Sequence, residues 1–318
     1  MKMATKTRKL QFPKPKKAVI KWLLGSDPSI RWQVMHDLTG EPTEVVAAER
    51  SRVAAEGWGA KLLARQSPDG RWGDGKAFAK WSSTLHTLVL LRDMGLDPNS
   101  GPALKAIGLV RDKVTWGSEF GNSPFFEGEV EPCINGATLA LGCYFGVISD
   151  RLVDRLLGEQ LEDGGWNCEA PKSNRSSFHT TIRVLEGLLA YELVKGAAAV
   201  TQARLRAQEV LLERRMFRSL STGEVIDRKW LQFSFPPTWH YDVLRGLDYL
   251  RSARVKPDER VIEAVQLVAK RQHQNGRWPL KNPHPDSVNF PMEPGSGKAS
   301  RWNTLRALRV LDWYSHQA

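Results

Sequence analysis

The sequence predicts an all-α protein that folds as a single (α/α)6 toroid, a double ring of about twelve helices. Three observations support this prediction. A loop of the form Gln-x-x-Asp/Asn-Gly-x-Trp occurs three times, at residues 66–72, 160–166 and 272–278. Helices with a wide polar face alternate along the chain with helices that are apolar nearly all round, and a helix of the second kind must be buried. No segment has the period-2 alternation of a half-buried strand.

Helix signals place the elements in order. After a leader rich in Lys and Arg, residues 18–25 form a short helix, and Asp27 and Pro28 open the next as its capping residue and first-turn proline. Further helices are expected over residues 41–66, 81–94, 102–113, 132–145, 150–160, 177–194, 201–217, 237–251, 257–273 and 299–314. The apolar helices start near residues 30, 81, 132, 178, 239 and 301. We therefore expect an inner ring made by these helices and an outer ring made by their partners.

Composition bounds the organisation and the partners. Of the 318 residues, 18–318 are expected to form one toroid domain behind a basic, mostly disordered leader at 1–17. The net charge is +11, but basic residues beyond the leader are scattered, so no nucleic-acid partner is expected. No apolar run is long enough for a transmembrane helix or a secretory signal, although contact with a membrane surface stays open. Three cysteines do not make a disulfide framework, so the expected location is cytoplasmic, and no obligate partner is evident.

Candidate binding residues follow from the predicted ring. Its inner helices run parallel, so their first turns gather with the Trp-containing loops at one mouth, where free backbone amides favour anions. The aromatic and polar side chains expected there suit an apolar ligand with a polar head. We expect substrate contacts from Trp32, Trp81, His86, Phe178, Trp239, Tyr241, Arg301 and Trp302.

Two further segments carry candidate residues for chemistry. His240 and Asp242 lie in the aromatic-rich segment 233–242, whose rings could stabilise a carbocation. The pKa of a carboxyl group at an apolar mouth can be raised, so we treat this pair as candidate catalytic residues. The alternative is that the segment is a plug packed between hairpins. The loop at 279–298, which contains five prolines, is expected to cover the mouth as a lid and adds the weaker candidates His284, Asp286 and Glu293.

The Gln- and Trp-containing loops, together with the helices that follow them, resemble those of squalene and oxidosqualene cyclases and of protein prenyltransferase β subunits. These proteins share the terpenoid cyclase/prenyltransferase α-α toroid, and the resemblance spans nearly the whole chain. It implies an isoprenoid or similarly apolar substrate in the central cavity, and transferase or cyclase chemistry. The Asp-x-Asp-Asp acid motif of the cyclases and the Asp-Asp-x-x-Asp motif of ionising terpene synthases are both missing from this sequence.

The prenyltransferase pattern also implies a metal site. In that family, zinc is held by Asp-x-Cys at the start of one inner helix and by the histidine of Tyr-His-Thr at the start of the next. This chain has Glu-Pro-Cys at residues 131–133 and Phe-His-Thr at 178–180 in those places. Three protein ligands and an open position are typical of catalytic zinc. The resemblance therefore implies zinc bound by Cys133, His179 and either Cys168 or Glu131.

Departures from the family leave other functions open. Residues 120–131 contain no Lys or Arg of the kind that holds the diphosphate in prenyltransferases, so protein prenylation is not expected. An (α/α)6 ring could instead be a carbohydrate-active hydrolase or lyase, which needs two carboxylates about 5 to 10 Å apart. The candidates for such a pair are Glu131, Asp242 and Asp286. A third possibility is a non-catalytic lipid-binding ring whose pocket has filled in. Cys143 is expected to be a core residue.

Overall fold

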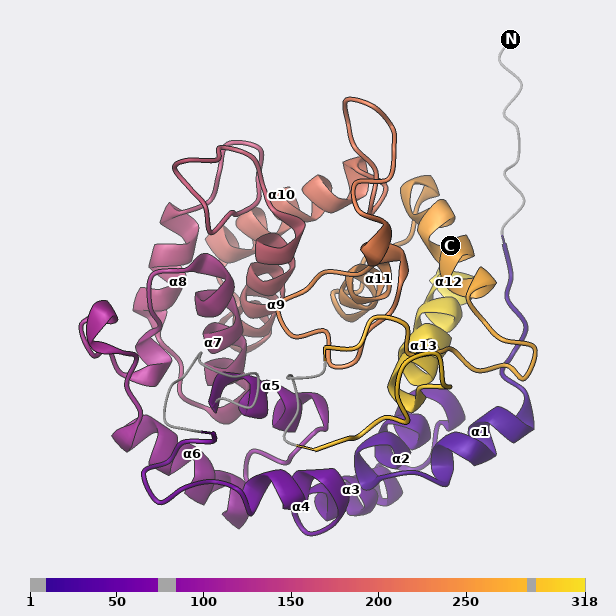
Figure 1. Cartoon of the computed structure of the whole chain (residues 1–318), viewed down its shortest axis with the longest axis horizontal. Helices are drawn as coiled ribbons and strands as arrows, with labels where there is room; N and C mark the ends of the chain where they lie inside the picture. The colour runs from indigo at the N-terminus through magenta and orange to yellow at the C-terminus, as the bar shows by residue number, and fades with distance from the viewer. Residues whose placement is uncertain (1–9, 74–83, 285–289, 318) are drawn as a thin grey trace.

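The computed structural model describes residues 10–73, 84–284 and 290–317, and its helices form two concentric rings (Figure 1). The inner ring consists of α2 (Pro28–Val34), α5 (Thr84–Asp93), α7 (Pro132–Phe145), α9 (Phe178–Lys195), α11 (Val243–Ser252) and α13 (Arg301–Gln317). The outer ring consists of α1 (Lys17–Leu24), α3 (Thr43–Ser51), α4 (Gly57–Leu63), α6 (Gly101–Lys113), α8 (Asp150–Gly158), α10 (Ala198–Glu213) and α12 (Ile262–Lys270). Within these ranges there are isolated β-bridges but no strand. The predicted all-α toroid is confirmed.

Each of the three Gln- and Trp-containing loops ties an outer helix to the inner helix that follows it. The indole Nε1 atoms of Trp72, Trp166 and Trp278 donate to carbonyl oxygens of α4, α8 and α12, at 2.7 Å in each case. The backbone N–H of each Trp donates to a threonine hydroxyl in the first turn of α5, α9 or α13. The Gln side chain donates to the Gly carbonyl of its own loop. All three indoles are buried, so these loops hold the double ring together from inside.

The backbones of α7 and α9 meet at two glycines. A Cβ atom on Gly136 would lie 2.6 Å from the carbonyl oxygen of Arg183, and one on Gly187 would lie 2.4 Å from the carbonyl oxygen of Gly136. Such an approach requires residues without a side chain. The contact holds the two helices side by side.

The outer helix predicted over residues 41–66 is divided in two, so the prediction of one continuous helix is wrong. After α3 the chain makes a 3-10 turn, and α4 begins at Gly57, whose φ is +64°. The cause is Asp27, which caps α2 and also accepts a hydrogen bond from the backbone N–H of Trp58 at 2.8 Å. A Cβ atom on Gly57 would lie 2.0 Å from the Asp27 carboxylate. The break therefore allows one carboxylate to serve an inner and an outer helix.

The predicted leader differs from the structure at its end. Residues 10–16 precede α1, and Phe12 packs edge-on against Tyr314 of α13 at 6.0 Å between ring centroids. The backbone N–H of Phe12 also donates to the Ser315 hydroxyl at 3.2 Å. Phe12 thereby buries apolar surface against the last inner helix.

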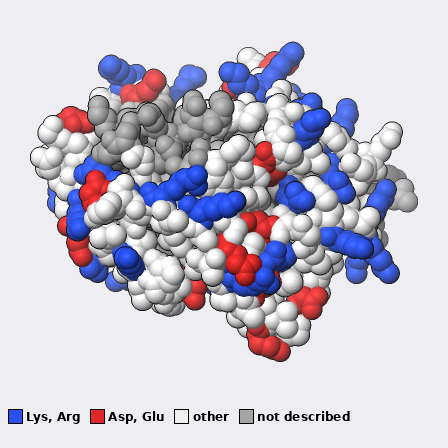
Figure 2. Space-filling view, turned by 60° about the horizontal axis from the view of Figure 1, so that its bottom comes forward, with Lys and Arg blue, Asp and Glu red and all other residues white. Residues whose placement is uncertain are grey.

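The ring closes where α13 meets α2. Arg309 of α13 donates to the Gln33 side chain of α2 at 2.8 Å and forms an ion pair with Asp37 just beyond that helix. On the face shown in Figure 2, Lys and Arg side chains are interspersed with Asp and Glu. Among the described helices, none is both long enough and apolar enough to cross a membrane.

Candidate functional site

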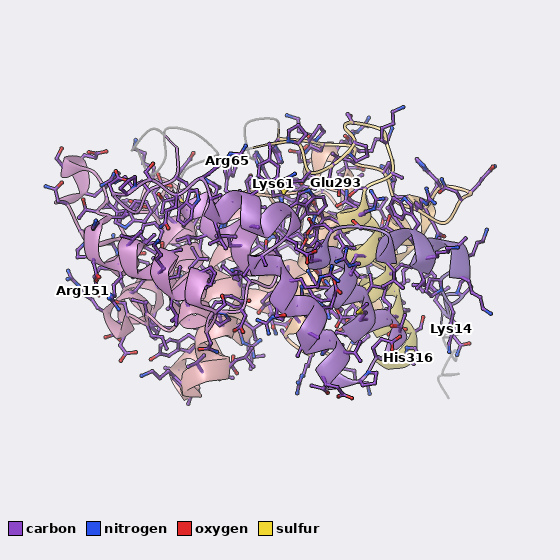
Figure 3. All side chains as sticks on the ribbon, turned by 90° about the horizontal axis from the view of Figure 1, so that it is seen from below. Lys14, Lys61, Arg65, Arg151, Glu293 and His316 are labelled. Carbon is purple, nitrogen blue, oxygen red and sulfur yellow. The ribbon has the colours of Figure 1, made fainter. Side chains whose placement is uncertain are left out.

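The inner helices enclose a central space, the bore, which has two ends. Their first turns gather at one end, the N-terminal mouth, and several of their last turns gather at the other, the C-terminal mouth. In Figure 3, Glu293, which caps the start of α13, lies near one edge of the ring, and His316, in the last turn of the same helix, lies near the opposite edge.

Three of the predicted metal ligands come together at the N-terminal mouth. The ligand atoms of Glu131, Cys133 and Cys168 lie within 4.8 Å of one another. The Cys133 thiol donates to the Glu131 carboxylate at 3.6 Å, and the Thr180 hydroxyl donates to Cys168 Sγ at 3.3 Å. Glu131 and Cys133 are placed by the start of α7, and Cys168 by the loop that leads into α9. We call these three residues the Glu-Cys-Cys cluster.

The chemistry of the Glu-Cys-Cys cluster fits a metal ion. The pKa of Cys133 is raised by the hydrogen bond between the two thiols and by burial. The same hydrogen bond lowers the pKa of Cys168, and a hydrogen bond from Thr180 lowers it further. Two sulfur donors and one carboxylate can bind a metal and leave a fourth coordination position open. The exposed Glu131 side chain keeps the cluster accessible from the mouth.

His179, the other predicted ligand, faces the segment that precedes α11. Its Nδ1 accepts a hydrogen bond from the backbone N–H of Tyr241 at 2.8 Å. Its ring lies 5.2 Å from that of Trp239 and 5.6 Å from that of Trp230. Burial, with a contribution from the charge of Arg245, lowers the pKa of His179 to about 4. The described residues whose ligand atoms gather around Cys133 do not include His179.

The aromatic segment before α11 is packed largely as a plug. Phe178 and Tyr241 are buried and contact each other at 4.9 Å between ring centroids, with Trp230 against both. The Tyr241 hydroxyl donates to the Met216 carbonyl at 2.7 Å. These contacts lie between hairpins, which favours a core role over substrate contact for Phe178 and Tyr241.

His240 forms the outer part of this segment. Its ring stacks on Trp239 and on His284, at 3.8 Å between centroids in each case. Burial lowers the pKa of His240 to about 3, helped by the neighbouring His284. Trp239 is 41% exposed, so this stack reaches the surface of the mouth.

Asp242, the proposed acid, caps α11. It is 2% exposed, one carboxylate oxygen accepts the backbone N–H of Arg245 at 2.8 Å, and the other accepts the N–H and hydroxyl of Ser234. The helix predicted from residue 237 accordingly begins at Val243. A carboxylate used in this way is not available to pair with Glu131 across the mouth, which weakens the carbohydrate-enzyme alternative. Asp286, the third carboxylate, lies outside the described residues.

The remaining predicted contacts are spread over the ring. The Trp32 indole donates to the Met94 carbonyl at 2.8 Å, at the end of α5. The Arg301 guanidinium stacks on Trp22 of α1 at 4.7 Å and therefore lies toward the outer ring. His86 is buried in α5, where burial and the charge of Arg183 lower its pKa to about 3. Trp81 lies outside the described residues. Trp302, by contrast, lines the bore and stacks on Phe235 at 4.3 Å.

The described part of the predicted lid is anchored to helices. Glu293 accepts hydrogen bonds from the Ser300 hydroxyl at 2.7 Å and from the backbone N–H of Trp302 at 3.1 Å, so it caps α13. Burial raises the pKa of Glu293. Phe290 lies under the Arg65 guanidinium of the outer ring at 4.7 Å. Glu293 thus has a structural role.

The bore contains a cavity of about 580 Å³, and most of its lining residues were not among the predicted substrate contacts. All six inner helices line it, and the last turns of α5, α7 and α9 contribute. Leu193 and Val194, which are 74% and 55% exposed, mark its opening at the C-terminal mouth. The hypothesis of a pocket that has filled in is therefore wrong.

The cavity walls are charged as well as apolar. The charged lining residues are Arg92, Asp93, Glu186, Arg245, Asp248, Arg306 and Arg309. Charges within otherwise apolar inner helices, such as Glu186 in the apolar α9, were the signal in the sequence that could have revealed them.

Arg183 adds an unbalanced charge to the bore. It is 3% exposed and makes no hydrogen bond or ion pair within the described part of the chain. Burial, together with the neighbouring Arg245, lowers its pKa to about 10. The centre of the ring is therefore rich in buried cations, which favours ligands with negative charge.

Comparison with known proteins finds similar solved structures at low sequence identity. Neither a scan of protein-family models nor a search of curated proteins gives a match. Among solved structures, the type II terpene cyclase MstE from Scytonema without ligand is 19% identical, over 95% of this chain and 89% of that one, with a TM-score of 0.45. A variant of the same cyclase in complex with its substrate geranylgeranyl dihydroxybenzoate is also 19% identical, over 97% of this chain and 91% of that one, with a TM-score of 0.47. A protein from Actinoplanes is 17% identical, over 91% of this chain and 90% of that one, with a TM-score of 0.44.

Proposed function

We propose that this protein binds an isoprenoid or similarly apolar compound in the bore and acts on it as a transferase or cyclase. The observation that carries the proposal is the open cavity of about 580 Å³ among the inner helices, beside the exposed Leu193 and Val194. Its volume lies within the range of about 300 to 1,000 Å³ that is usual for small-molecule sites. Apolar side chains at the opening would lower the cost of transferring an apolar ligand from water.

In this proposal a zinc ion is held by Glu131, Cys133 and Cys168. When bound, zinc can lower the pKa of a nucleophile or polarise an oxygen atom. The residues of the chain supply the orientation: α7 presents Cys133 from its first turn, and the Thr180 hydroxyl stabilises the Cys168 thiolate by donating to it. His179 is left out of the ligand set because its Nδ1 is bonded to the Tyr241 N–H.

The zinc proposal is tested by elemental mass spectrometry of freshly purified protein. Wild type is expected to carry about one zinc per chain. Cys133→Ala and Cys168→Ala are expected to lose it. Cys143→Ala is the matched control, because Cys143 is on the same helix as Cys133 but outside the Glu-Cys-Cys cluster. Metal-free wild type, or equal loss in the control, would contradict the proposal.

The binding proposal is tested with farnesol, a neutral prenyl alcohol, by isothermal titration calorimetry. Leu193→Gln is expected to weaken binding several-fold, because about 1 to 2 kcal/mol of apolar burial is lost at the cavity opening. Leu104→Gln is the control, since Leu104 is also exposed, at 59%, but lies on the outer helix α6. If wild type does not bind farnesol, or if both variants weaken it equally, the bore is not the binding site.

A further inference from the structure

The cavity in the bore has a cationic wall and an apolar wall. Arg306 and Arg309 line it from α13, and they lie on one face of that helix because they are three residues apart. Leu189, Leu193 and Val194 line it from α9. Figure 1 shows α9 and α13 on different sides of the ring, with α11 between them. A ligand that spans the cavity therefore meets charge at one end and apolar surface at the other.

The acidic groups of the cavity already have close partners. Arg245 holds the Glu186 carboxylate through two hydrogen bonds, at 2.8 and 2.7 Å, and Arg92 holds Asp93 at 3.0 and 2.8 Å. Asp248 accepts from Arg251 at 2.8 Å. The acidic groups that contact the two arginines of α13 are Asp37, which pairs with Arg309, and Asp248, which lies 3.5 Å from Arg306 and is shared with Arg251.

Arg306 is poorly satisfied. Its side chain is 9% exposed, and its contacts are long: 3.3 Å from Nη1 to the Ser234 carbonyl and 3.5 Å from Nε to Asp248. Both values exceed the usual N–H···O distance of about 2.9 Å. With the other described residues, its Nη2 makes no hydrogen bond.

Arg309 also keeps unused donors. Its side chain is 10% exposed, and its Nη2 serves Gln33 and Asp37. Its Nε is buried and has no partner within the described residues. Burial lowers the pKa of Arg309. Burying a charge is costly unless the charge is paired, and an anion bound by either guanidinium would offset part of that cost.

We propose that the cavity binds an amphipathic ligand whose oxyanion head, a carboxylate or a phosphate, is held by Arg306 and Arg309. The apolar part of the ligand lies on the wall formed by Leu189, Leu193 and Val194. This inference rests on the proposed function, because both place an apolar ligand in the bore, and it adds the chemistry of the head group. The planar guanidinium fork matches the geometry of either oxyanion.

The test compares three ligands with the same prenyl chain: farnesol, farnesoic acid and farnesyl monophosphate, each titrated into the full chain by calorimetry. Wild type is expected to bind at least one anionic ligand about tenfold or more tightly than farnesol, the gain typical of charged hydrogen bonds. Arg306→Gln and Arg309→Gln are each expected to abolish this difference, because each removes one of the two cationic groups that hold the anion. Retained farnesol binding shows that each variant is folded.

Two further variants complete the design. Arg306→Lys keeps the charge but loses the planar fork, and is expected to keep only part of the preference for the anion. Arg111→Gln removes an exposed arginine of α6 and controls for the change in net charge. The head group that binds more tightly identifies the carboxylate or the phosphate as the source of the oxyanion.

The outcomes separate the two proposals. If wild type binds farnesol but binds neither anion more tightly, the oxyanion site is wrong and the proposed function stands. The oxyanion site is also wrong if Arg306→Gln and Arg309→Gln keep the preference for the anion over farnesol, or if Arg111→Gln reduces that preference as much as they do. If none of the three ligands binds wild type, the proposed function fails and the oxyanion site fails with it.

Discussion

His86 is nearly fully buried in α5, and its pKa is lowered to about 3 by burial and by the charge of Arg183. The unfolded chain has a histidine pKa of about 6.5, so between these values it binds more protons than the folded chain. Stability therefore rises with pH in this window. The contribution of His86 is fully present above about pH 6.5 and is lost as the pH falls toward about 3.

The contribution of His86 to the pH dependence of stability can be measured with a single substitution. Between about pH 7 and pH 5, His86 is expected to reduce the free energy of unfolding of wild type by about 2 kcal/mol. His86→Asn is expected to show a correspondingly shallower dependence in urea denaturation. His316→Asn, at a histidine whose side chain is 65% exposed, is the control and should keep the wild-type slope. Equal slopes for wild type and His86→Asn would show that His86 is not held neutral.

Individual side chains show why some features could be predicted from the sequence and others could not. The repeated loops could be found from the sequence because Gln, Gly and Trp recur at fixed spacing, and each buried indole bonds within ten residues of its own position. His179 was assigned to zinc because Phe-His-Thr resembles the Tyr-His-Thr of prenyltransferases, and Asp242 to catalysis because the pKa of a carboxyl group at an apolar mouth can be raised. Their partners, Tyr241 for His179 and Ser234 for Asp242, come from a segment whose path the sequence does not reveal.

At the scale of elements, the crossing of α7 and α9 has no room for a side chain. Gly187→Ala is expected to lower the free energy of unfolding by about 1 to 3 kcal/mol, because the added methyl group meets the Gly136 carbonyl at 2.4 Å. Gly108→Ala is the matched control in α6, where the new methyl group meets nothing within 4 Å. It should raise stability by about 0.5 to 1 kcal/mol through helix propensity. Urea denaturation distinguishes the two, and a similar change in both would contradict the close contact.

Element boundaries were predicted less well than element types. Each inner helix that the structure describes from its start begins close to its expected position, apart from α11, which starts at Val243. The helix expected over residues 41–66 is interrupted, and the one expected from 237 starts later, for the same reason. In both places an aspartate, half-buried Asp27 or buried Asp242, accepts backbone hydrogen bonds at a helix start. A capping side chain ends or delays a helix according to its neighbours in space, which hydrophobic periodicity does not report.

For the whole molecule, the repeats predicted the double ring but not where space remains inside it. Apolar periodicity identifies which helices face inward. It does not tell how side chains of different sizes fill the bore along its length. The predicted substrate contacts were therefore placed at the N-terminal mouth. That mouth holds the Glu-Cys-Cys cluster, while the cavity opens beside Leu193 and Val194 at the other end. The two ends of the ring thus have different chemistry.

Ring closure by α13 also fixes the order in which this site can be assembled. α13 follows the other five inner helices in the chain, and it carries Trp302, Arg306 and Arg309. A chain emerging from the ribosome therefore exposes the Glu-Cys-Cys cluster to solvent and metal well before the cationic wall has been synthesised. Domains begin to fold while synthesis continues. Metal binding at the proposed zinc site can thus precede ligand binding at the proposed oxyanion site, and a chain terminated before residue 301 would retain the cluster while lacking Arg306 and Arg309.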